Sequence, residues 1–132
     1  MSTPLTELTL LGTAIVWGLI QLLWAALAAR GQQGYGWGTG PRDDPRPLSG
    51  SAARLDRAFK NYMETFPFFA AAVLLVTQLD KHGTLTLVGC SLYVAGRVIY
   101  VPLYYAGVHY LRTLVWQISA AGLFMVIAAL FL

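Results

Sequence analysis

Residues 8–29 read LTLLGTAIVWGLIQLLWAALAA and contain no charged side chain. About 20 consecutive apolar residues are enough for a helix to cross the hydrocarbon core of a bilayer. The stretch is therefore predicted to be a transmembrane helix. A cleavable signal peptide is the less favoured interpretation, because the segment before the stretch carries Glu7 and no Lys or Arg. A signal peptide has the opposite charge at its start.

The composition of the whole chain also indicates a membrane protein. Of its 132 residues, 57% are hydrophobic and only 11% are charged, whereas a soluble domain carries about 25% charged residues. This composition argues against a soluble enzyme. The net charge of +3 is small and scattered, so nucleic acid is not expected as a partner. A single cysteine, Cys90, excludes an internal disulfide framework and any zinc site built from several cysteines.

We expect an all-α membrane protein, in which residues 1–132 form a single domain with a bundle of four transmembrane helices. The helices are expected over about 5–30, 52–79, 84–106 and 112–132. Residues 31–50 are rich in glycine and proline and have no hydrophobic periodicity, which predicts a loop. Pro67 lies inside the second helix and predicts a kink there.

Basic residues are unevenly distributed between the two predicted sides of the membrane. One side carries Arg30, Arg42, Arg46, Arg54, Arg57, Lys60 and Arg112, and the opposite side carries Lys81 alone. The positive-inside rule then places the loop 31–50 in the cytoplasm and both termini outside. The same basic cluster is also suited to binding anionic lipid headgroups. Both interpretations stay open, because orientation and lipid attraction use the same charges.

A polar stripe runs along the second predicted helix. At about 100° per residue, Arg54, Arg57, Asn61 and Glu64 fall within an arc of about 80°, and Lys60 lies near its border. A charged side chain at the centre of a bilayer costs about 2.5 kcal/mol or more. The stripe is therefore expected to face protein or a wet cavity, with Asn61 and Glu64 as its deepest members.

The third predicted helix carries a second polar face, formed by Arg97, Tyr100 and Tyr104 at spacing i, i+3, i+7. Arg97 lies about 12 Å below the end of this helix, at 1.5 Å per residue, which is too deep for its side chain to reach the interface unaided. An ion pair between Glu64 and Arg97 would neutralise both groups. The remaining basic residues then meet few acids, which favours a pocket for an anionic ligand.

Other kinds of site are not favoured. His82 and His109 are expected on opposite sides of the membrane, so they cannot share a metal ion. No serine or cysteine has a plausible base beside it, so a hydrolase arrangement is not expected. A transporter or channel is disfavoured, because the charges gather at one mouth and do not line the full depth of the membrane.

Residues 54–69 read RLDRAFKNYMETFPFF, with the pattern Arg-x-x-Arg-Ala-x-x-Asn-x-x-Glu-Thr. This pattern resembles the second-helix signature of the MAPEG family, the membrane-associated proteins of eicosanoid and glutathione metabolism. Residues 97–107, RVIYVPLYYAG, and residues 111–116, LRTLVW, are similar to the bacterial branch of that family. The resemblance extends over the whole chain in helix number and loop order. One departure is Lys60, where many members carry arginine.

The resemblance implies a homotrimer of four-helix subunits, with glutathione bound between neighbouring subunits near the cytoplasmic face and no metal. It implies that glutathione is bound by Arg30, Arg54, Arg57, Lys60, Asn61, Glu64, Arg97, Tyr100 and Tyr104. Arg112, which opens the fourth helix, is implied to lie near the thiol and to be the catalytic residue. Positive charge beside a thiol favours the nucleophilic thiolate.

The function implied is that of a glutathione transferase or peroxidase in a bacterial inner membrane, acting on lipophilic electrophiles that enter from the bilayer. The alternative is a non-catalytic membrane interaction protein that binds anionic lipid. In that case, the polar stripe forms ion pairs between subunits and the basic mouth binds phospholipid.

Overall fold

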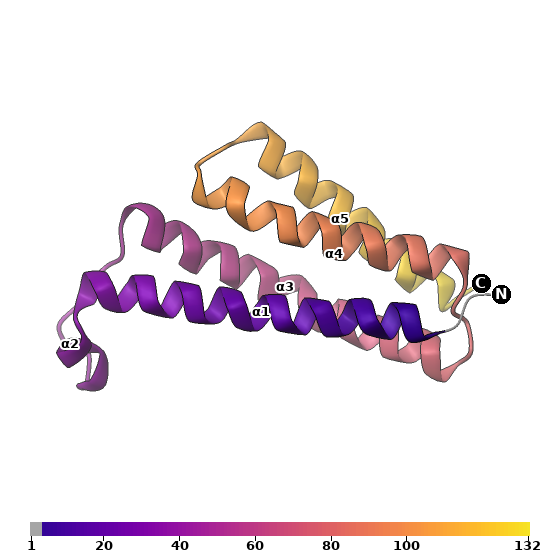
Figure 1. Cartoon of the computed structure of the whole chain (residues 1–132), viewed down its shortest axis with the longest axis horizontal. Coiled ribbons are helices and arrows are strands. Elements are labelled where there is room, and N and C mark those ends of the chain that lie inside the picture. Colours follow the sequence, from indigo (N-terminus) through magenta and orange to yellow (C-terminus); the bar gives the residue numbers. More distant parts are fainter. Residues whose placement is uncertain (1–3) are drawn as a thin grey trace.

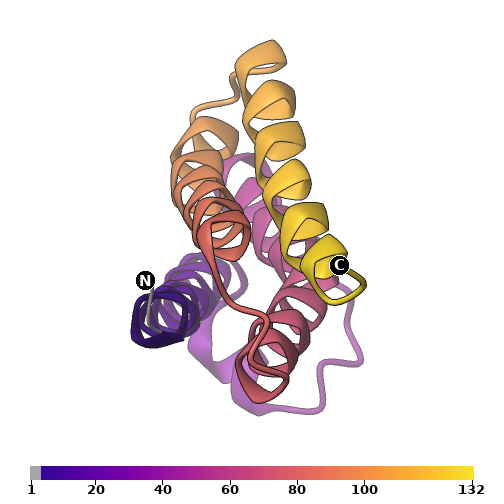
Figure 2. The same ribbon diagram turned by 90° about the vertical axis from the view of Figure 1, so that its right-hand side faces the viewer.

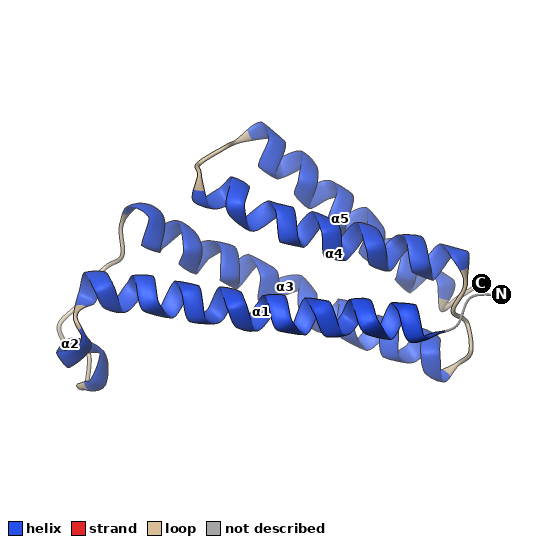
Figure 3. Cartoon of the chain, viewed as in Figure 1, coloured by secondary structure: helices blue, strands red, loops and turns tan. Residues whose placement is uncertain are grey.

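The computed structural model describes residues 4–132, and this part of the chain is entirely helix, turn and loop (Figure 3). Its helices are α1 (Pro4–Gln33), α2 (Tyr35–Thr39), α3 (Gly50–Gln78), α4 (Thr84–Tyr105) and α5 (Tyr110–Ala129). The four long helices correspond to the ranges expected from the sequence. Pro67 lies inside α3 and Pro102 near the end of α4.

The segment 31–50 differs from the loop expected there. The helix α1 continues to Gln33, and α2 occupies part of the segment. Gln33 ends α1 through two bonds to Arg46: its side-chain Nε2 donates to the Arg46 carbonyl at 2.7 Å, and its own carbonyl accepts from Arg46 Nη1 at 2.7 Å. Gly34 then turns the chain with φ of +89°, a conformation that favours glycine. These contacts lie outside any hydrophobic periodicity, so the sequence pattern did not predict them.

The long helices form two pairs, α1 with α3 and α4 with α5, which pack against each other (Figure 1). The view along the bundle shows α1 and α5 at its two sides, with α3 and α4 between them (Figure 2). Both ends of the described chain lie at the same end of the bundle, with the α3–α4 connection. We call this the terminal end. The opposite end, which holds α2 and the α4–α5 connection, is the α2 end.

The helices α4 and α5 approach most closely through glycines near the terminal end. A Cβ atom added to Gly122 would lie 2.5 Å from the Gly89 carbonyl oxygen, and one added to Gly89 would lie 2.7 Å from the Gly122 carbonyl oxygen. Small residues at such positions allow membrane helices to pack backbone against backbone. Cys90 and Val126, beside this contact, are fully buried. Neither glycine can therefore be enlarged without moving the two helices apart.

Three of the described helices are long and apolar enough to cross a membrane, and they cover Leu5–Gln33, Thr84–Tyr105 and Tyr110–Ala129. The helix α3 is of similar length, but its first half carries the charged stripe and lowers its hydropathy. Leu23 and Leu27 on α1 are 62% and 63% exposed, as expected for side chains that face lipid.

Candidate functional site

A cleft of about 490 Å³ lies between α3, α4 and α5 in the half of the bundle nearer the α2 end. This volume is typical of sites for small molecules. The residues that line the cleft are Arg57, Lys60, Asn61 and Glu64 from α3, Tyr100 and Tyr104 from α4, and Arg112, Thr113 and Trp116 from α5. Three of these side chains are basic and one is acidic.

The periodicity of α3 explains how its residues reach the cleft. Arg57, Asn61 and Glu64 recur at the spacing of one helix face. Ala58 and Tyr62 lie on another face and are buried against neighbouring helices. Arg54 belongs to the same stripe, but its Nη1 donates to the Tyr105 carbonyl at 3.1 Å and the residue does not line the cleft. The stripe therefore enters the cleft only from residue 57 onward.

Tyr104 lies between two arginines. Arg57 Nε donates a hydrogen bond to the Tyr104 hydroxyl at 3.0 Å. The guanidinium carbon of Arg112 lies 4.5 Å from the centre of the Tyr104 ring, and that of Arg57 lies 5.8 Å from it. Within the described residues, neither arginine has a carboxylate within 4.0 Å, since the ion pairs there are Arg46–Asp44, Lys60–Asp56 and His82–Asp80. Both guanidinium groups are therefore available to an anionic ligand.

Lys60 and Asn61 are held by other residues. Lys60 Nζ lies 2.9 Å from Asp56 Oδ2, so part of its charge is already neutralised. Asn61 Oδ1 accepts a hydrogen bond from Trp116 Nε1 at 3.1 Å. This bond leaves the two amide N–H donors of Asn61 for a ligand. Trp116 thus fixes the orientation of Asn61 at the wall of the cleft.

The ion pair expected between Glu64 and Arg97 is not formed within the described residues, so this prediction is wrong. Arg97 points into the bundle, where it is 1% exposed. Its guanidinium carbon lies 4.8 Å from the centre of the Tyr100 ring and 5.4 Å from that of Tyr62. Glu64 is exposed on the cleft side of α3.

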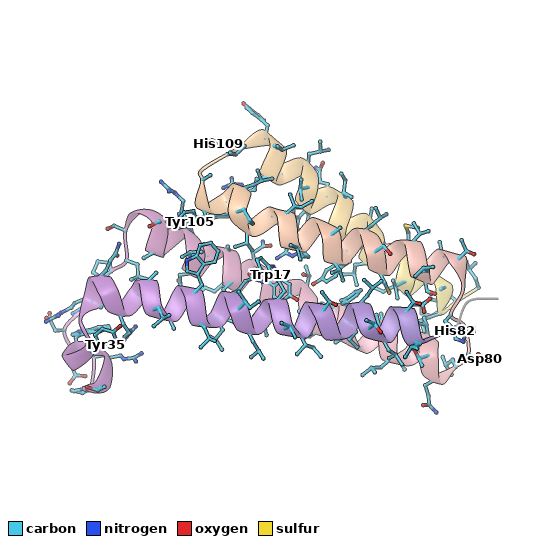
Figure 4. The ribbon with its side chains drawn as sticks, in the orientation of Figure 1. Trp17, Tyr35, Asp80, His82, Tyr105 and His109 are labelled. Carbon is cyan, nitrogen blue, oxygen red and sulfur yellow. The ribbon has the colours of Figure 1, made fainter. Side chains whose placement is uncertain are left out.

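None of the side-chain nitrogens of Arg97 has a hydrogen-bond partner among the described residues. Tyr100 lines the cleft and has Arg97 against its ring. Trp17 from α1 donates its Nε1 hydrogen to the Arg97 carbonyl at 3.2 Å, and Figure 4 shows Trp17 directed from α1 toward α4. Arg97 therefore supports the cleft wall from behind and does not line the cleft itself.

Arg30 also lies outside the cleft lining. It is near the end of α1, where its Nη2 donates to Gln33 Oε1 at 2.6 Å and its guanidinium carbon lies 5.6 Å from the centre of the Trp37 ring. Seven of the ten site residues expected from the sequence line the cleft, and Arg30, Arg54 and Arg97 do not.

Two lining residues, Thr113 and Trp116, were not among the expected site residues. Trp116 follows Arg112 by four positions, so it projects from the same face of α5. Given Arg112 as a site residue, this spacing could have predicted that Trp116 also faces the cleft. The sequence alone favoured packing or an interfacial position for a tryptophan instead.

The described residues contain no group of three or more His, Cys, Asp or Glu side chains that could hold a metal ion. His82 and His109 lie at opposite ends of the bundle (Figure 4). His82 Nε2 lies 2.9 Å from Asp80 Oδ1 in the α3–α4 connection. The chemistry available in the cleft is therefore that of its guanidinium, carboxylate, amide and hydroxyl groups.

Comparison with known proteins gave one finding. The model of the MAPEG family matches residues 10–132, which include every residue that lines the cleft. No curated protein and no solved structure matches the chain.

Proposed function

The chain belongs to the MAPEG family, and from this premise we propose that it is a membrane-embedded glutathione transferase or peroxidase. Membership confirms the resemblance based on residues 54–69. Together with the three long apolar helices, it identifies the chain as an integral membrane protein. The proposed substrate is a lipophilic electrophile or peroxide that enters from the bilayer, with glutathione as co-substrate.

The observation that carries the proposal is the charge pattern of the cleft. Glutathione has two carboxylates and one ammonium group at neutral pH. The cleft offers Arg57 and Arg112, which have no carboxylate partner among the described residues, and the exposed carboxylate of Glu64. In the proposed complex Arg57 binds a carboxylate of glutathione, Glu64 accepts hydrogen bonds from the ammonium group, and Arg112 lies beside the thiol. Asn61 and Tyr100 add hydrogen-bonding groups along the same wall.

In the proposed reaction Arg112 acts on the thiol of glutathione. Arg112 lies in the first turn of α5, where the helix dipole adds to the charge of the guanidinium. Both favour the thiolate, of which a free thiol contains only a few per cent at neutral pH. The thiol proton passes to water, and the thiolate sulfur forms a bond to the electrophilic carbon of the second substrate while the bond from that carbon to its leaving group, such as a halide, breaks and the leaving group departs with the electron pair. In the peroxidase reaction, a second glutathione completes the disulfide while the peroxide is reduced to an alcohol and water.

The proposed assembly is a homotrimer with glutathione bound between subunits. Arg57 and Glu64 are exposed in the single subunit although they lie well inside a helix of 29 residues. Charged side chains facing lipid at that depth would cost about 2.5 kcal/mol each or more. A neighbouring subunit that covers the cleft would remove this cost. That neighbour would also be the source of the contact expected from Arg30, which its own subunit keeps outside the cleft.

The proposed location is a bacterial inner membrane, with segment 31–50 in the cytoplasm and both termini outside. Basic residues gather toward the α2 end, whereas Lys81 lies in the α3–α4 connection at the terminal end. This asymmetry follows the positive-inside rule.

The experiment that tests the function is a calorimetric titration of the detergent-purified protein with glutathione. Arg57→Ala is expected to weaken glutathione binding about 10- to 100-fold, because it removes a charged hydrogen-bond donor. Arg42→Ala is the matched control, since it removes the same charge from the segment 31–50, outside the cleft. Equal losses for both variants would show that the site extends beyond the cleft. Absence of glutathione binding by the folded protein would contradict the proposal.

A second candidate is a non-catalytic protein that binds anionic lipid. It is favoured by one observation, the gathering of arginines around Trp37 at the α2 end. Titration with an anionic lipid beside glutathione separates the two candidates. Binding of lipid without any binding of glutathione would support the non-catalytic protein.

A further inference from the structure

A second cluster of positive charge lies at the α2 end and shares no residue with the cleft. Three guanidinium carbons surround the ring of Trp37, at 5.6 Å for Arg30, 5.7 Å for Arg42 and 5.9 Å for Arg46. We call these four residues the Trp37 cluster. Arginine beside an aromatic ring has several N–H donors, so those that the protein does not use can bind oxygen atoms of a ligand.

Backbone contacts hold the Trp37 cluster in place. Trp37 Nε1 donates to the Asp44 carbonyl at 2.6 Å, Arg42 Nε donates to the Gly38 carbonyl at 2.9 Å, and Arg46 Nη1 donates to the Gln33 carbonyl at 2.7 Å. The Arg30 side chain lies over Gly38, where an added Cβ atom would be 2.5 Å from Arg30 Nη1 and would make this side chain shift. The arginines are therefore fixed around one ring before any ligand arrives.

The positive charge of the Trp37 cluster is only weakly neutralised by the protein. Asp44 lies 3.6 Å from Arg46 Nε, and its side chain is 77% exposed, so this ion pair contributes little. Arg30 and Arg42 have no carboxylate within 4.0 Å among the described residues. Arg30 Nη1 is shielded from solvent and has no hydrogen-bond partner there. All three cations lie within 6 Å of one ring centre, close enough to repel one another in physiological salt.

The position of the Trp37 cluster indicates which kind of anionic ligand it would bind. It follows directly on α1, a helix whose Leu23 and Leu27 are exposed as lipid-facing side chains are. The end of a membrane-spanning helix lies at the level of the headgroups, where tryptophan is enriched and lipid phosphates are concentrated. We propose that the Trp37 cluster binds the phosphate of an anionic phospholipid headgroup. The proposal does not depend on glutathione binding, because no residue of the cluster lines the cleft and Arg42, the residue changed in the principal variant below, has no part in the proposed glutathione site.

The test measures how tightly the detergent-purified protein binds short-chain phosphatidylglycerol, by native mass spectrometry and by the rise in Tm on titration. Phosphatidylcholine and inorganic phosphate are titrated in parallel. We expect phosphatidylglycerol to be retained and to raise Tm, and the other two to have at least about 10-fold weaker effects. Equal effects of phosphatidylcholine would overturn the proposal. Equal effects of inorganic phosphate would assign the cluster to free phosphate and overturn the lipid as its ligand.

Arg42→Gln is the principal variant, because Arg42 is exposed and its substitution leaves α1 intact. It is expected to weaken phosphatidylglycerol binding about 10-fold, as for loss of one charged hydrogen bond. Lys81→Gln removes the same charge at the terminal end and is expected to change nothing in lipid binding. Gly38→Ala keeps every charge but displaces Arg30, and is also expected to weaken lipid binding. Lipid binding by Arg42→Gln and Gly38→Ala as tight as that of the natural sequence would contradict the proposal.

Discussion

The helices pack closely in the terminal half of the bundle and leave a cleft in the α2 half. In the terminal half, α4 and α5 meet at Gly89 and Gly122, and Cys90 and Val126 beside this contact are fully buried. In the α2 half, the two helix pairs diverge (Figure 1), and long polar side chains line a cleft of about 490 Å³. Small residues thus close one half, and large charged residues keep the other half open. The terminal half fixes the helix positions, so the α2 half can hold a site.

The largest effect is expected from Gly122→Leu, which would force α4 and α5 apart in the terminal half. A Cβ atom alone would already lie 2.5 Å from a backbone oxygen that cannot move independently. Overpacking of this kind costs about 3 kcal/mol or more in the free energy of unfolding. Thermal unfolding in detergent should show a large fall in Tm or no folded protein. Gly12→Leu is the control, because a Cβ atom at Gly12 has no neighbour within 4 Å. Equal Tm values for the two variants would mean that the glycine contact is not what closes this half.

Arg112→Ala is expected to affect activity without affecting stability, because Arg112 lies in the cleft and not in the closely packed terminal half. We expect an unchanged Tm and a rate of glutathione conjugation lowered about 100-fold, the cost of losing one group that stabilises developing charge. Conjugation is measured at saturating glutathione with a lipophilic aryl halide. A variant that purifies with the native assembly and the full rate would remove Arg112 from the catalytic role.

Trp116→Phe tests whether the wall of the cleft orients Asn61. The substitution keeps an aromatic ring and removes the hydrogen bond of 3.1 Å from Nε1 to Asn61 Oδ1. Loss of one such bond costs about 1 kcal/mol, so glutathione affinity should fall about 5-fold. Trp24→Phe is the matched control, since Trp24 lies against Tyr105, at 5.2 Å between ring centres, and does not line the cleft. Calorimetric titration of both variants compares them, and equal affinities would show that Asn61 is oriented without Trp116.

The smallest effect is expected from Lys60→Gln. Lys60 is paired with Asp56 at 2.9 Å, and its side chain is 72% exposed, so its charge is shared and screened. Glutathione affinity should change less than about 2-fold, within the range of an exposed ion pair. The double variant Asp56→Asn with Lys60→Gln should bind as Lys60→Gln does. If Lys60→Gln lowered glutathione affinity as much as Arg57→Ala does, Lys60 would have to break its ion pair with Asp56 and bind glutathione itself.

The sequence predicted the long helices and most of the cleft, because both depend on periodicity within one helix. Residues 57, 61 and 64 share a face of α3 whatever its neighbours are. The partner of Arg97 could not be predicted in this way, since it depends on how α4 is rotated against α3. The rotation buries Arg97 against Tyr62 of α3 and leaves Glu64 exposed. The position of Arg30 likewise depends on α2, a helix of five residues too short to show any periodicity.

Both ends of the described chain lie away from the cleft, on the far end of the bundle (Figure 1). Successive copies can therefore be fused head to tail with linkers that stay clear of the cleft. In a fusion of three copies that forms the proposed homotrimer, Arg112→Ala could be placed in one, two or all three copies of the same polypeptide. Turnover that falls by one third per altered copy would mean that the sites work independently. A steeper fall would mean that turnover at one site depends on the activity of the other two.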